Sequence, residues 1–111
     1  TVNPVNPSKV IRNRVCRLTD LPNIGKAVAR DLVMIGISEP EQLSGRCPLE
    51  MYRDLCEATD TLQDPCVIDV FMSVTSFMAG NEALPWWHFT AERKRLLARS
   101  PRLQSARKAG A

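Results

Sequence analysis

The sequence predicts an all-α fold, a compact bundle of about five short helices, from three observations. Apolar residues recur at three- and four-residue steps, and no segment alternates apolar and polar residues as a half-buried strand does. Helix start and stop signals separate these segments. The 111 residues and an apolar fraction of 44% suit a single core.

The first two predicted helices are joined by a short turn. Residues 9–18, KVIRNRVCRL, place apolar side chains on one face and arginines off it, and we expect this helix to end near Thr19. A second helix is predicted over residues 26–35, with Gly36 as its left-handed C-terminal cap.

Two helices are predicted in the middle of the chain. Ser38 and Glu41 have the spacing of a capping box, which would begin a short helix that Gly45 closes. Cys47 and Pro48 predict the start of the next helix, because proline suits the first helical position. Its inward stripe would consist of Met51, Tyr52, Leu55 and Cys56.

The most hydrophobic helix is predicted to begin at Asp64 and Pro65, an acidic N-cap followed by proline, and to end at Gly80. We expect it to lie at the centre of the bundle, because its apolar residues recur along its whole length. These residues are Val67, Val70, Phe71, Val74, Phe77 and Met78.

The C-terminal part is less apolar. Residues 81–89, NEALPWWHF, have the composition of a loop, and TAERKRLLARS predicts a last helix capped by Thr90. Residues 101–111 hold too little apolar surface to fold and are expected to be disordered. The sequence therefore predicts a helical domain over residues 1–92 and a basic C-terminal helix with a disordered tail over residues 93–111.

Charge is distributed unevenly along the chain. Residues 1–30 carry six Lys and Arg against one acidic residue, and residues 91–111 carry seven against one. Residues 31–90 carry two basic residues against ten acidic ones. Basic ends around an acidic middle indicate a polyanionic partner that contacts the ends, although a solvated basic tail that aids solubility is a common alternative.

Several classes of protein are disfavoured. No apolar run approaches the roughly 20 residues that cross a bilayer, and the first residues lack the layout of a secretory signal. A soluble cytoplasmic protein without membrane contact is expected. No phosphate loop, nucleotide-binding motif or nucleophile motif occurs, and His88 is a poor general base, so we expect neither an enzyme nor a cofactor.

The four cysteines do not indicate a metal site. None forms a C-x-x-C pair, and reduced, half-buried thiols are expected. Cys47, Cys56, Cys66 and His88 could supply four zinc ligands, but their spacing matches no known pattern. Three aspartates, Asp60, Asp64 and Asp69, lack the ligand density of a calcium loop.

The stretch DLPNIGKAVA, residues 20–29, predicts a tight turn between the first two helices. Gly25 readily adopts a positive φ, and Asn23 is the next best residue type for that region. Ile24 would plug the groove between the helices. This is the pattern of a helix-hairpin-helix, in which Asn23 replaces the first of two glycines.

The turn would open onto the N-terminal end of the second helix, whose first amides have no intrahelical acceptor. Such a helix end attracts anions, and neighbouring cations would add to its field. We therefore expect it to contact the phosphate backbone of nucleic acid, without reading sequence. The candidate residues are Asn23, Ile24, Gly25, Lys26, Ala27 and Arg30.

The chain also resembles a bacterial family of helix-hairpin-helix proteins, the pathogenicity-locus or mitomycin-resistance-like family. The resemblance covers roughly residues 14 to 92 and rests on LTDLPNIGKAVARDLVMIGI, EPEQLSGRCPLEMYRDLC, DPCVIDVFMSVTSFM and WWHF. It implies an all-helical fold similar to the sterile-alpha-motif-like type and a link to DNA repair or damage resistance. It implies no settled biochemical activity.

Two functions of different classes remain open. The first is a non-catalytic module that binds nucleic-acid backbone, and the second is a protein-interaction module whose acidic middle or basic tail docks a partner. The sequence does not set the oligomeric state. Trp86 and Trp87 could stack on unpaired bases, but we expect one or both to close the core against the hydrophobic helix.

Overall fold

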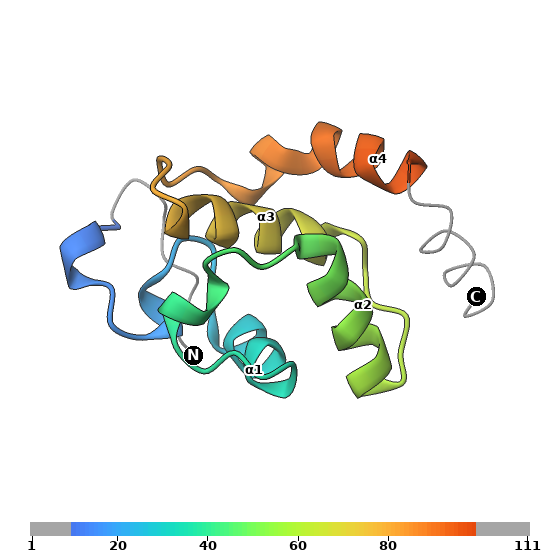
Figure 1. The fold of residues 1–111 in the computed structure, drawn as a ribbon, viewed down its shortest axis with the longest axis horizontal. Coiled ribbons are helices and arrows are strands. Elements are labelled where there is room, and N and C mark those ends of the chain that lie inside the picture. Colours follow the sequence, from blue (N-terminus) through green and yellow to red (C-terminus); the bar gives the residue numbers. More distant parts are fainter. Residues whose placement is uncertain (1–9, 100–111) are drawn as a thin grey trace.

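The computed structural model describes residues 10–99, in which four α-helices and four 3-10 turns are present and no β-strand occurs (Figure 1). The α-helices are α1 (Lys26–Met34), α2 (Pro48–Thr59), α3 (Cys66–Met78) and α4 (Thr90–Ala98). The 3-10 turns are η2 (Arg12–Arg14), η3 (Leu18–Asp20), η4 (Pro40–Leu43) and η5 (Trp86–Phe89). The predicted all-α class is confirmed.

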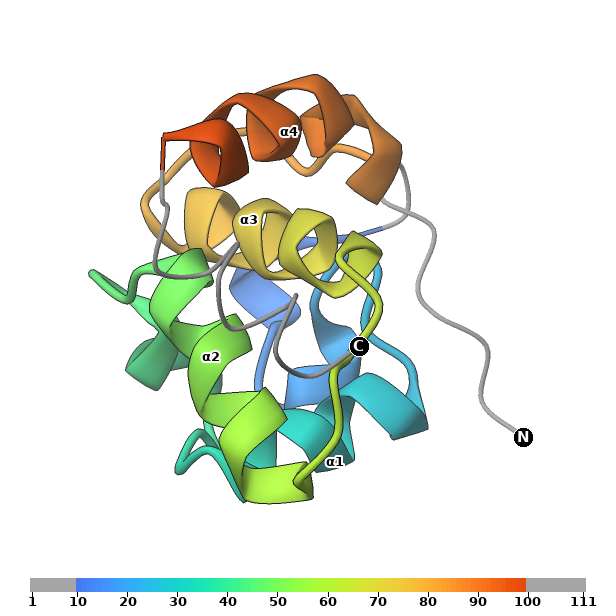
Figure 2. The ribbon, with the colours of Figure 1, turned by 90° about the vertical axis from the view of Figure 1, so that its right-hand side faces the viewer.

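Helix α3 lies in the middle of the molecule. Figures 1 and 2 show α4 on one side of it, and α1 and α2 on the other. Phe71 and Val74 of α3 are completely buried, which confirms the prediction that the most hydrophobic helix is the central one. Each such side chain contributes roughly 1.5–3 kcal/mol relative to an exposed position.

The predicted helix over residues 9–18 is wrong for the residues that the structure describes. The chain forms η2 and η3 instead, with Val15 and Arg17 extended between them. The guanidinium of Arg12 donates hydrogen bonds to the carbonyl oxygens of Phe77 and Asn81, both at 2.6 Å. Because these acceptors lie at and just beyond the C-terminal end of α3, tertiary contacts rather than helix bonds fix this segment.

The predicted capping box uses different residues. Oε1 of Gln42, not the carboxylate of Glu41, accepts hydrogen bonds from the N–H groups of Ser38 (2.7 Å) and Glu39 (3.0 Å). The short helix that follows is the 3-10 turn η4. The N-cap is Glu39, one position later than predicted, because Pro40 takes the first helical position, so the residue that closes the box also moves by one position, to Gln42.

Most other predicted boundaries are confirmed. Helix α2 begins at Pro48, and Oδ1 of Asp64 accepts a hydrogen bond from the N–H of Cys66 at the start of α3 (2.8 Å). Gly36 and Gly80, which follow α1 and α3, have φ angles of 86° and 102°. Glycine adopts this left-handed region without steric cost.

Helix α4 continues across the predicted boundary between residues 92 and 93, and Leu97 packs in the core. Thr90 is the first residue of α4 rather than its N-cap, and its hydroxyl donates to the carboxylate of Asp69 (2.7 Å). Part of the predicted loop over residues 81–89 forms η5. The tail that we expect to be disordered lies outside the described residues.

Candidate nucleic-acid interface

The turn before α1 reverses the chain through a single residue in the left-handed region. Asn23 has a φ of 66°, whereas Gly25 has a φ of −97° and a nearly extended ψ of −173°. The expectation of a positive φ is therefore confirmed at Asn23 and wrong at Gly25. Asparagine is one of the few residue types that reach this region at modest cost.

The side chain of Asn23 explains why asparagine, not glycine, suits this turn. It is only 8% exposed, and its amide nitrogen donates to Oγ of Ser73 (3.0 Å) and to the carbonyl oxygen of Leu84 (2.9 Å). These bonds attach the turn to α3 and to the segment before η5. The amide group thus has partners within the protein, while the backbone supplies the left-handed bend.

The remaining candidate residues divide into buried and exposed groups. Ile24 is completely buried, as expected for a plug, and Gly25 is buried as the N-cap of α1. Lys26, Ala27 and Arg30 are exposed on α1. Of the six candidates, therefore, three face solvent and three lie inside the fold.

Lys26 and Arg30 line one shallow depression of about 480 Å³. Its other lining residues are Thr19, Ala29 and Val33. Sequence reasoning did not identify Thr19 or Val33 as neighbours of this site. Helical spacing could have found Val33, since residues 26, 30 and 33 share one face of α1, but Thr19 reaches it only through the fold.

The charges around this depression are mainly positive. No residue among 10–99 accepts a hydrogen bond from the N–H groups of Lys26 or Ala27, so these amides still carry the partial positive charge of the helix end. Nearby Asp31 is half-buried, which raises the pKa of its carboxyl group, although the charge of Arg30 acts in the opposite direction.

Asp20 has its own local partners. Its Oδ2 accepts hydrogen bonds from the N–H groups of Cys16 (3.0 Å) and Arg17 (2.9 Å). These bonds, that of Arg17 foremost, hold the pKa of Asp20 below its ordinary value. The carboxylate therefore caps the N-terminal end of η3 and stays ionised at neutral pH.

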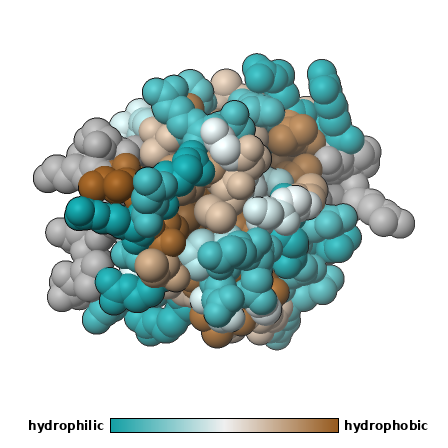
Figure 3. All heavy atoms as spheres, turned by 60° about the vertical axis from the view of Figure 1, so that its left-hand side comes forward, coloured by the Kyte–Doolittle hydropathy of each residue, from teal (hydrophilic) through white to brown (hydrophobic). Residues whose placement is uncertain are grey.

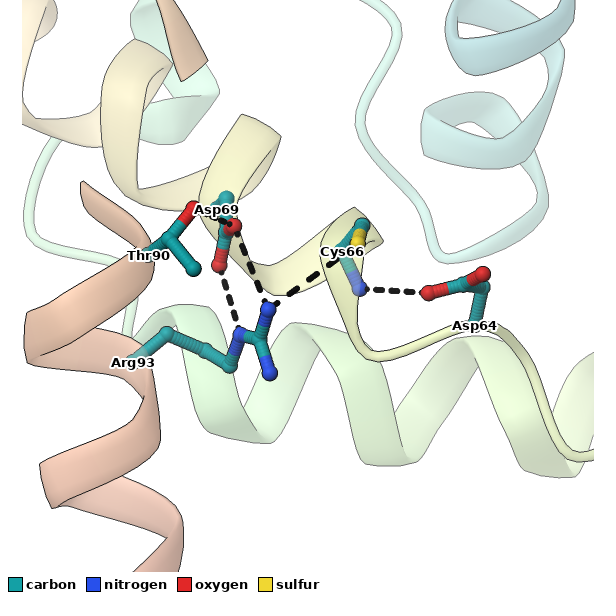
Figure 4. A network of polar contacts seen from close by, with 5 residues as sticks. All are labelled: Asp64, Cys66, Asp69, Thr90 and Arg93. Carbon is teal, nitrogen blue, oxygen red and sulfur yellow. Dashed lines mark hydrogen bonds and ion pairs between the residues drawn. The ribbon is translucent and has the colours of Figure 1, made fainter. Parts of the chain in front are cut away.

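A second polar cluster joins α3 to α4 (Figure 4). Asp69 is completely buried, and its Oδ1 accepts a hydrogen bond from Nε of Arg93 (2.8 Å) while its Oδ2 accepts one from Thr90. The bond to Asp69 raises the pKa of the Arg93 guanidinium. Both charges are thus neutralised inside the fold.

Cys66 lies at the edge of this cluster, 3.9 Å from Nη2 of Arg93. Its pKa is raised, first by a hydrogen bond with Asp64 and then by burial. The sequence analysis considered Asp69 only together with Asp60 and Asp64, as a possible cation ligand. The feature that could have indicated a buried ion pair is an aspartate between Ile68 and Val70 on an otherwise apolar helix.

The structure supports no metal site in the part of the chain that it describes. No group of three or more His, Cys, Asp or Glu side chains there could hold an ion. All four cysteines are free, and Cys16 and Cys47 are exposed rather than half-buried. Within residues 10–99, no helix has the length and hydropathy that spanning a membrane requires.

The two tryptophans do not fill the core as expected. Phe89 supplies the buried aromatic ring of η5, whereas Trp86 is half-buried and Trp87 is 63% exposed. Their rings meet edge to face, with centroids 5.7 Å apart and planes at 84°. Figure 3 shows that mostly hydrophilic side chains, with separate hydrophobic patches among them, cover the face that it presents.

Comparison with known proteins identifies a family and a relative. The family model described as pathogenicity locus matches residues 11–95. The chain is also 48% identical over 81 residues to the mitomycin resistance protein McrB of Streptomyces lavendulae, an alignment that covers 73% of this chain and 77% of that relative. No solved structure matches the chain.

Proposed function

The chain belongs to the pathogenicity locus family, and from this premise we propose that it is a non-catalytic module that binds the phosphate backbone of nucleic acid. The binding site is the start of α1, with Lys26 and Arg30 as the main ligands. It acts as the turn of a helix-hairpin-helix does, although η3 replaces the first helix.

The observation that carries this proposal is the placement of Lys26 and Arg30. Both are exposed, and both line the depression beside the turn. A phosphate there would meet two cations and the unpaired amides of the first turn of α1, which together favour an anion. Contacts of this kind carry no sequence information, so binding would not depend on base sequence.

The relative's name gives the process that we propose. It is called a mitomycin resistance protein, and a module that binds DNA backbone suits a part in damage resistance. We therefore propose DNA as the partner and resistance to DNA damage as the process.

The test is a titration of labelled duplex DNA at several salt concentrations. The double variant Lys26→Glu, Arg30→Glu should bind at least about tenfold more weakly, and the slope of log affinity against log salt should fall by about 1.8. The matched control is Arg46→Glu, Arg53→Glu, which makes the same charge change on and beside α2. Arg46 and Arg53 pair with Asp54 at partly exposed positions, so the control variant should fold.

The control separates a local site from a general charge effect. If both variants lose the same affinity, α1 is not the site. If neither loses affinity, or if the wild-type chain binds no duplex even at low salt, the proposal fails. The protein-interaction function would then be favoured.

A further inference from the structure

We infer that the outer face of η5 and α4 is a second binding surface, which takes single-stranded nucleic acid by stacking an unpaired base on Trp87. The phosphates beside that base would lie on Lys94 and Arg95. This surface uses none of the residues proposed above for duplex binding. An experiment can therefore support or overturn single-strand binding at this surface independently of duplex binding at α1.

The exposed ring of Trp87 is the first observation. A tryptophan that is 63% exposed leaves most of its aromatic face in water, which is uncommon for so large an apolar side chain. Its contact with Trp86 is edge to face, so the two rings do not stack on each other. The exposed part of the Trp87 ring is available, and stacking on a base would bury it.

The charge of α4 is the second observation. Lys94, Arg95 and Arg99 are exposed, against the single exposed acid Glu92. The charge of Arg93 does not contribute, because Asp69 neutralises it inside the fold. The outer face is thus positive overall, which complements a phosphate backbone.

The order of these residues suits a strand that runs along the helix. Trp87, Ala91 and Lys94 are all exposed, and η5 leads directly into α4, so they lie along one continuous segment. Ala91 lies between Trp87 and Lys94, and its small side chain leaves this path open.

The fold holds this surface rigidly. Phe89 anchors η5 in the core, and the bonds of Thr90 and Arg93 to Asp69 fix α4 on α3 (Figure 4). An ordered platform loses little entropy on binding, which favours affinity. A paired base is already stacked within its duplex, so this platform suits unpaired bases.

The two surfaces lie on different elements. Figures 1 and 2 show α4 and α1 on opposite sides of α3. The segment before η5 does contact the turn before α1, through the bond from Asn23 to Leu84, so each variant is tested on both duplex and single strand. A strand bound at α4 and a duplex bound at α1 would contact different sides of the molecule.

The test is anisotropy of the full chain with a labelled oligo-dT, an oligo-U, the duplex used above, and an abasic strand of equal length. Trp87→Ala should weaken single-strand binding by about 5- to 150-fold and leave duplex and abasic binding within about twofold. Trp87→Phe keeps an aromatic face and should retain most of the affinity. Lys94→Glu, Arg95→Glu should weaken all three single strands and lower their salt slopes.

Each outcome decides the inference. Unchanged oligo-dT and oligo-U binding in Trp87→Ala overturns it, and so does equal wild-type affinity for the abasic strand, a comparison that needs no variant to fold. Loss of single-strand binding only in Lys26→Glu, Arg30→Glu would assign the strand to α1 and also overturn it. Loss of oligo-dT or oligo-U binding in Trp87→Ala with abasic binding retained supports the inference, whichever of the two strands binds more tightly.

Discussion

At the residue scale, Asn23 has two roles in the turn, one through its backbone and one through its side chain. Its backbone adopts a φ of 66°, and its amide bonds to Ser73 and Leu84. Glycine would provide the bend but not the bonds, and alanine would provide neither. The asparagine at this position therefore provides tertiary contacts that a glycine could not make.

These two roles predict an order of stability. Asn23→Gly should lower the free energy of unfolding by about 1–3 kcal/mol, because two buried hydrogen bonds are lost. Asn23→Ala should cost about 1 kcal/mol more, because alanine is strained in the left-handed region. Urea unfolding measures both, with the exposed Asn13→Ala as a control that should stay within about 0.5 kcal/mol of wild type.

If glycine and alanine at position 23 destabilise the protein equally, the backbone conformation contributes nothing. If both resemble the Asn13 control, the bonds to Ser73 and Leu84 contribute nothing either.

At the scale of elements, the buried pair between Asp69 and Arg93 determines how α4 packs. Asp69 is completely buried on α3 and Arg93 is nearly so on α4. Removing one partner of such a pair leaves an uncompensated buried charge, whereas replacing both by apolar residues of similar size is often neutral. We therefore expect the pair to contribute more to where α4 lies than to net stability.

A double-mutant cycle tests this statement. Arg93→Met alone and Asp69→Leu alone should each lower the free energy of unfolding by about 3–5 kcal/mol. The double variant should lie much closer to wild type. Arg46→Met, which breaks the partly exposed pair with Asp54, is the control and should cost less than about 1 kcal/mol.

Additive losses in the double variant would mean that the two side chains do not interact. Small losses in both single variants would mean that the pair is hydrated in solution.

At the scale of the whole molecule, the three layers depend on one another through α3. Helix α4 contributes Leu97 to the core and Arg93 to the buried pair. A domain that ended at residue 92 would lack both. The unit that the described contacts define therefore extends at least through α4.

Truncation tests the extent of this unit. A chain of residues 1–99 keeps every contact described above and should unfold near the temperature of the full chain. A chain of residues 1–92 should lose more than about 5 kcal/mol, from an unpaired buried carboxylate and a missing core leucine. That is much of the 5–15 kcal/mol typical of a domain. Circular dichroism during heating measures both, and similar melting of the two chains would show that α4 is not part of the unit.

Local chemistry allowed much of this fold to be predicted. The starts of α2 and α3 follow from proline and an aspartate cap, and their apolar stripes follow from helical periodicity. The helix predicted before the turn is wrong, because Arg12 binds the carbonyl groups of Phe77 and Asn81. These acceptors lie 65 and 69 positions further along the chain. No local pattern reports an acceptor so distant in the chain.

The sequence by itself determined the helical class, the turn at residues 21–25 and the exposed cations of α1, since these depend on residue type and short-range spacing. Only the tertiary structure decided that Asn23 faces inward, that Thr19 joins the depression, and that Trp87 lies outside the core. Each of these depends on which groups from distant segments fill a space or accept a hydrogen bond. These contacts form only when the other elements pack around α3.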